Sequence, residues 1–138
     1  MPDTGNAVIA ALRAKLVPAL APFGCPVVDY GAEDQAMPYC LFGRHTSDPD
    51  DTFTESYTIH RIVLEIYTGP NRNATGAVRG KAQCRSIVEA ARAAVHHARL
   101  TLSEGKCVRC QVERTNVDPG ADVVTTEGSL IVRVDVAG

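Results

Sequence analysis

The sequence predicts an α+β protein in which two helices pack on one face of a mainly antiparallel sheet of about four strands. Two segments, residues 9–20 and 75–98, place apolar residues at helical spacing, whereas most of the remaining chain alternates apolar and polar residues. The predicted strands follow one another through hairpin-length turns, which favours antiparallel pairing. A chain of 138 residues fits a single domain, which we place at 1–138.

The composition is that of an ordinary globular protein, with 45% hydrophobic and 22% charged residues. A formal net charge of -2 gives no electrostatic reason to expect affinity for nucleic acid or an anionic membrane. Arg13 and Lys15 interrupt the apolar N-terminal run, so we expect neither a signal peptide nor a membrane span. Five cysteines, an odd number, argue against a disulfide framework and favour synthesis in a reducing cytoplasm.

The first predicted helix begins at a capping residue and ends near a proline. Thr4 or Asn6 can cap its N-terminus. Pro18 disfavours helical geometry at Val17, so we expect the helix to end or kink there. Its apolar face consists of Ile9, Leu12, Leu16 and Leu20.

Two strands separated by a polar loop follow a short extended piece at 27–30. The first strand covers Pro38 to His45, and the acidic segment from Thr46 to Ser56 is expected to be a loop. The second strand, at 57–68, is the strongest in the sequence. One of its faces is apolar, and the other mixes apolar and charged residues, so we expect that second face to be only partly covered within one subunit. The mixed face contains Tyr57, Ile59, Arg61, Val63, Glu65 and Tyr67.

The C-terminal half begins with the second predicted helix, at 75–98, which carries an apolar stripe opposite a charged one. A short strand at 100–102 and two long strands, Cys107 to Asn116 and Gly128 to Val136, are expected to follow.

The pair Cys107 and Cys110, in the sequence CVRC, has the spacing of a zinc or thiol-disulfide motif. Residues i and i+3 of a strand point to opposite faces, so the two thiols could reach one metal only if a bulge or turn separated them. No second close pair of ligands accompanies them, and the motif does not begin a helix. We therefore expect structural cysteines, one buried and one facing outward.

Three weaker motifs fail on spacing. GAVRGKA, residues 76–82, lacks the fourth intervening residue and the hydroxyl of a phosphate-binding loop. DPDDTFTE, residues 48–55, lacks the glycine and the final glutamate of an EF-hand. His45 and His60 could face one another across a hairpin, where a surface position is the more common outcome. Nothing in the sequence argues for catalysis.

The order of elements nevertheless resembles a known family. The corresponding pieces are an N-terminal helix, Pro38–Tyr39 before an apolar strand, the polar loop 46–56, the strand from Ile59 to Tyr67, the Ala- and Arg-rich helix from Ala82 to Ala98, and the closing hairpin. This pattern resembles the tail terminator or tail completion proteins of long-tailed phages and related gene transfer agents.

The resemblance implies a structural virion protein without catalysis or cofactor. Such proteins form a homohexameric ring on the head-proximal end of the tail tube, stop its growth and allow joining to the head. The implied partners are other copies of the chain, the tail tube protein and a head–tail connector protein, and DNA passes through the ring without specific binding. The implied location is the virion tail at the head–tail junction, with synthesis in the host cytoplasm.

We expect the interface in the acidic loop and on the mixed strand face, at Asp48, Asp50, Asp51, Phe53, Glu55, Tyr57, Ile59, Arg61 and Tyr67. Three alternatives remain open at this point. The chain could act as an adaptor or stopper of the same connector, as a small metal-binding or thiol-active protein using Cys107 and Cys110, or as an enzyme using His45 or His60.

Overall fold

The computed structural model describes residues 4–28, 38–50, 56–69, 80–119 and 126–137. Within them the predicted α+β class is confirmed, with five strands in place of about four. The elements are α1 (Gly5–Leu20), a short 3-10 helix (Ala21–Phe23), β1 (Val27–Val28), β2 (Tyr39–Pro49), β3 (Tyr57–Thr68), α2 (Gly80–Val95), β4 (Lys106–Pro119) and β5 (Thr126–Ala137).

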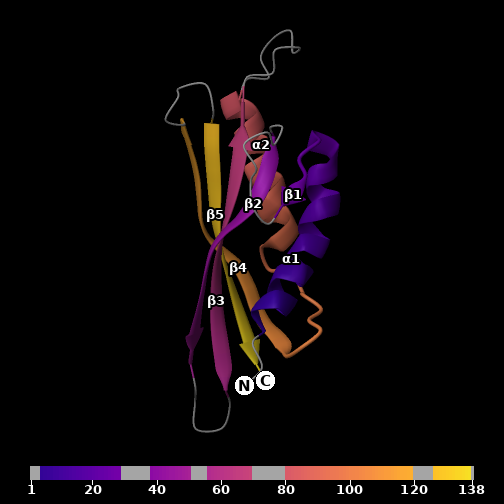
Figure 1. The fold of residues 1–138 in the computed structure, drawn as a ribbon, viewed down its shortest axis with the longest axis vertical. Coiled ribbons are helices and arrows are strands. Elements are labelled where there is room, and N and C mark those ends of the chain that lie inside the picture. The colour runs from indigo at the N-terminus through magenta and orange to yellow at the C-terminus, as the bar shows by residue number, and fades with distance from the viewer. Residues whose placement is uncertain (1–3, 29–37, 51–55, 70–79, 120–125, 138) are drawn as a thin grey trace.

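The strands form one twisted sheet in the order β1-β2-β3-β5-β4. The fifth strand is the two-residue β1, which pairs parallel to β2 through Val27 and Cys40. All other pairs are antiparallel, as expected. Both helices lie on the same face of the sheet, as the sequence predicts, and no described element covers the opposite face (Figure 1).

The core lies between the helices and the sheet. Every second residue of β3 and β5 points into it, and each helix contributes one apolar face. Burial of each such Leu, Ile or Val side chain stabilises the fold by roughly 1.5–3 kcal/mol. The fully buried residues include Val8, Leu12, Leu16, Leu20, Ile62, Leu64, Ile66, Ile87, Val95, Leu130 and Val132.

Helix α1 differs from the prediction at both ends. It continues through Pro18 to Leu20, and both Pro18 and Ala14 are exposed, so the carbonyl that proline leaves without a donor faces water. Thr4 occupies the N-cap position without a side-chain cap bond, because its hydroxyl is hydrogen-bonded to His60. The segment Gly5–Phe23 is long and apolar enough to cross a membrane by composition alone. Its buried apolar face packs in the core of this fold.

The predicted loop at 46–56 is wrong for its first four residues. Thr46, Ser47, Asp48 and Pro49 continue β2 and pair with β3 as far as Thr58. The Asp50 N–H extends this pairing by donating to the Tyr57 carbonyl oxygen at 2.9 Å. A polar strand forms here because the ladder with β3 satisfies its backbone, whatever its side chains. Residues 51–55 lie outside the described part of the chain.

Two boundaries in the C-terminal half also differ. Helix α2 ends at Val95 rather than Ala98, because His97 adopts a φ of 61° and its N–H donates to the Cys110 carbonyl oxygen at 2.8 Å. Residues 100–102 do not form the short strand that their apolar pattern indicated, and β4 begins at Lys106.

Candidate interaction surface

The sheet face opposite the helices is left without a cover by the described elements (Figure 1). We call it the outer face. Its central residues are all half-buried, and from Ile59 onward on β3 and throughout β5 they alternate with buried neighbours. The predicted mixed face of β3 is therefore confirmed as partly covered. The central residues are Tyr57, Ile59, Arg61, Val63, Glu65 and Tyr67 on β3, and Ser129, Ile131, Arg133 and Asp135 on β5.

Two arginines stand directly opposite one another at the centre of the outer face. Arg61 of β3 pairs across the ladder with Arg133 of β5, an arrangement in which like charges repel. Each arginine has its own carboxylate: Arg61 Nε lies 3.0 Å from Glu113 Oε1, and Arg133 Nε lies 2.8 Å from Asp135 Oδ1. These pairs fix the guanidinium groups in place. Because the Arg61 side chain is 38% exposed, its ion pair contributes at most about 1 kcal/mol.

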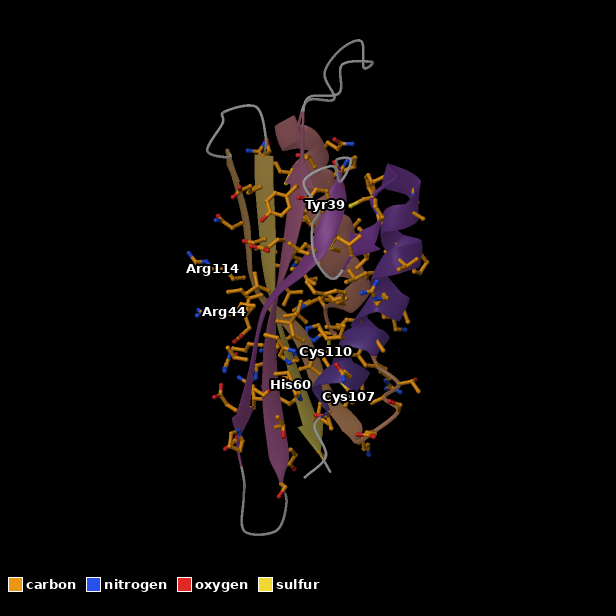
Figure 2. The ribbon with its side chains drawn as sticks, in the orientation of Figure 1. Tyr39, Arg44, His60, Cys107, Cys110 and Arg114 are labelled. Carbon is orange, nitrogen blue, oxygen red and sulfur yellow. The ribbon has the colours of Figure 1, made fainter. Side chains whose placement is uncertain are left out.

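Asp48, at the edge of this surface, lies 3.8 Å from Arg61 and is 64% exposed. Arg44 and Arg114 project from the side of the sheet that faces away from the helices (Figure 2). The outer face thus combines half-buried apolar side chains with charges of both signs. A protein–protein interface combines apolar area with a polar rim, and this face offers both kinds of group.

An aromatic pair lies at the other end of the outer face. The rings of Tyr39 and Tyr67 stack with their centroids 5.1 Å apart. Partial burial, followed by the nearby carboxylates of Glu65 and Glu127, raises the pKa of Tyr67 to about 12. The phenol therefore stays neutral at ordinary pH and offers a flat apolar surface with a polar tip, a combination that favours interfaces.

The expected surface position of the two strand histidines is wrong for His60. His60 is fully buried on the helix side of β3 rather than on the surface. Its Nε2 lies 2.8 Å from Thr4 Oγ1, and its Nδ1 lies 2.9 Å from His45 Nε2 and 3.0 Å from Ser47 Oγ. His45 and His60 do face one another across β2 and β3, as expected. The cluster joins the start of α1 to the sheet, which gives it a structural role.

The expectation that Cys107 and Cys110 lie on opposite faces of the sheet is also wrong. Cys107 pairs with Val136 and Cys110 with Val134, so both cysteines occupy core-side positions of β4. The register shift between Cys107 and Arg109 inserts one extra residue and cancels the expected change of face. Cys110 is buried and its thiol lies 3.2 Å from the Val95 carbonyl oxygen, while Cys107 is half-buried. Burial raises the pKa of the Cys110 thiol to about 12, which makes it a poor nucleophile.

Among the residues that the structure describes, no three His, Cys, Asp or Glu side chains are grouped so that they could hold a metal ion. Of the predicted interface residues, Tyr57, Ile59, Arg61 and Tyr67 lie together on the outer face, and Asp48 lies at its edge. Asp50 is exposed just beyond β2, and the predicted Asp51, Phe53 and Glu55 fall outside the described residues.

Sequence reasoning missed the contribution of β5 and β4 to this surface. The alternation of Ile131, Arg133 and Asp135 with buried valines repeats the pattern of β3, and this was the available signal. Glu113 gave no such signal, because a second register shift, between Val112 and Arg114, sets its position.

These features define a small α+β protein in which no described element covers one face of the sheet. Residues 6–136 match the protein family described as tail completion protein gp17. The chain belongs to this family, and it is a structural component of a virion tail.

One solved structure has the same fold over its whole length. It is a chain from the virion of a native gene transfer agent particle, with a TM-score of 0.79, 20% sequence identity and 100% of both chains covered. A search of curated proteins found no significant match.

Proposed function

We propose that this chain forms a homohexameric ring that caps the head-proximal end of the tail tube, ends tube growth and provides the surface to which the head is joined. The family match over residues 6–136 is the observation that carries this proposal. The likeness to a chain of a gene transfer agent virion supports it through the fold. The order of elements, which resembles that of tail terminators, implies the same role.

The mechanism is interfacial rather than catalytic. Each copy contributes the outer face, in which Ile59, Val63 and Ile131 offer apolar area and Arg61 and Arg133 offer fixed charges. Burial of half-exposed apolar area drives association, and the paired charges set the register between the partners. A closed ring then covers the tube end and leaves no free site for the next tube subunit.

The remaining partners follow from this role. The ring contacts the tube protein on one side and a head–tail connector protein on the other, and DNA passes through its lumen. A formal net charge of -2 suits such a passage, because many phosphate contacts would hold the DNA tightly. Asp51, Phe53 and Glu55 remain part of the proposed interface.

The test is the length of tails made in particle-producing cells that lack this chain, measured by electron microscopy. A terminator predicts tubes that exceed the normal length and carry no head, with normal tails restored when the chain is supplied again. Tails of normal length that fail to join heads would contradict the terminator role. They would assign the chain to an adaptor or stopper position in the same connector.

A further inference from the structure

A basic cleft lies beside the first residues of β4. It has a volume of about 680 Å³ and lies between residues 97–102 and 105–110. Three cations line it, Arg99, Lys106 and Arg109, and all three residues are exposed. Its lining contains no carboxylate.

The same cleft exposes an apolar side chain. Val108, at the register shift of β4, is 56% exposed although it belongs to a strand. Above it the strand edge is closed, because the Cys110 carbonyl oxygen accepts from the His97 N–H and the Val112 N–H donates to His96 Nδ1. The cleft is therefore a defined concavity at the lower part of this edge, suited to an acidic segment with some apolar character.

The opposite edge of the sheet carries the complementary charge. After its short pairing with β1, strand β2 has no further partner strand on that edge among the described residues. Asp48 near its end and Asp50 just beyond it are both exposed. In the sequence, residues 47–56 contain four carboxylates and no basic residue. Charges at an edge also discourage uncontrolled pairing of strands, so a specific partner must match them.

The acidic end of β2 and the basic cleft lie at the same height along the strands of the sheet. Pro49 pairs with Thr58, Thr58 with Val136, and Val136 with Cys107, so one row of residues crosses the sheet from the acidic edge to the cleft. Three strand spacings separate the ends of this row, roughly 14 Å. Both edges lie at the end of the molecule where β5 finishes, as Figure 1 shows.

We propose that the basic cleft of one copy receives the acidic end of β2 from the next copy. The contact joins two different surfaces of one chain, so it is head-to-tail and generates a ring or an open filament. Because both surfaces lie at one level, successive copies are related by rotation with little rise, which favours closure. This inference rests on the proposed ring and adds to its outer-face contact a second contact, between the cleft and the end of β2.

Charge reversal on each side separately tests the contact. The cleft variant is Lys106→Glu/Arg109→Glu, and the edge variant is Asp48→Lys/Asp50→Lys. A control, Lys15→Glu/Arg85→Glu, makes the same change of charge as the cleft variant, on exposed positions of the two helices. The assembly state of the full chain is measured by mass photometry, and the fold by circular dichroism.

Each reversed variant alone is expected to raise the apparent dissociation constant of the assembly at least about tenfold, because like charges meet at every contact. The control is expected to assemble as the original chain does. An equimolar mixture of the cleft and edge variants is expected to recover assembly, since rings with the two variants in alternation restore opposite charges at every contact. The chain that carries all four reversals is expected to assemble on its own.

Rings that form equally well from either variant would overturn this contact and leave the proposed ring intact. A mixture that fails to recover would overturn it as well. Absence of any assembly in the original chain would instead count against the ring itself, and the contact would fall with it. If the cleft variant lost only affinity for a double-stranded DNA fragment, the cleft would be a nucleic-acid site and the inference would be wrong.

Discussion

His60 shows how a polar side chain becomes part of a core. It is fully buried, and Thr4, His45 and Ser47 all lie within hydrogen-bonding distance of its two ring nitrogens. A buried polar group without such partners would cost roughly 1–3 kcal/mol. The partners come from α1 and β2, so this one residue fixes both elements to β3.

The buried thiols make the free energy of unfolding depend on pH in the alkaline range. Burial raises the pKa of Cys25, Cys40 and Cys110 from 9.0 to about 12 in each case. From about pH 9 to about pH 12 the unfolded chain loses these protons while the folded chain retains them. We therefore expect the free energy of unfolding, measured by urea denaturation, to fall as pH rises, by up to about 1.4 kcal/mol per pH unit for each thiol.

A pair of variants separates the effect of the thiols from other causes of lower stability at alkaline pH. Cys40→Ala removes one titrating group and is expected to reduce the slope of stability against pH. Ile62→Val also truncates a core side chain, four residues along β3 from the partner of Cys40, and we expect it to lower stability by the same amount at every pH. Equal slopes for the original chain and Cys40→Ala would contradict the assignment.

At the scale of elements, the packing of α2 against the sheet depends on one glycine. A side chain at Gly128 of β5 would place its Cβ 2.7 Å from Cys84 Sγ and 2.7 Å from Val88 Cγ2 of α2. The absence of a side chain lets the helix approach the strand closely.

Gly128→Ala is therefore expected to lower the free energy of unfolding by about 1–3 kcal/mol, because α2 must shift to admit the methyl group. Ser129→Ala, on the next residue and the outer face, is the matched control and should change stability by less than about 0.5 kcal/mol. The double variant Gly128→Ala/Val88→Ala should recover part of the loss. Thermal and urea unfolding measure all three, and a neutral Gly128→Ala would show that the helix has room to move.

The sequence predicted well those elements in which burial in the core sets the spacing of the apolar residues. The strand at 57–68 and both helices follow from periodicity, because the core imposes it. Apart from the continuation of α1 through Pro18, the misses share one physical origin, which is contact between segments distant in sequence. Thr46 to Pro49 form a strand because β3 satisfies their backbone, and a bulge brings Cys107 to the face of Cys110. His60 is buried because its polar partners come from other elements. Side-chain pattern alone records none of these contacts.

The described part of the chain is a layer of two helices on a sheet, and none of its elements covers the other face of that sheet (Figure 1). Its two sides are therefore different, and contacts between copies can repeat in one direction around a ring. The outer face supplies apolar area at its centre, while the edges of the sheet supply opposite charges at one level.

A charge at the centre of the outer face should prevent assembly without unfolding the chain. Ile59→Asp and Ile131→Asp each place a carboxylate where the proposed contact buries apolar area, and both positions are half-buried in the single chain. We expect complete loss of rings by mass photometry and a melting temperature within a few degrees of the original. Thr115→Asp, on an exposed position of β4, is the control for added charge. Rings that survive Ile59→Asp would exclude the centre of the outer face as a contact.

The position and number of copies in the assembled particle test the central claim most directly. Cryo-electron microscopy of purified tails gives both at once, with the fold of this chain as the search template. The proposed function predicts a single closed ring of six copies at the head-proximal end of the tube, with the outer face in contact with protein. Copies distributed along the tube, or found only at its opposite end, would contradict it.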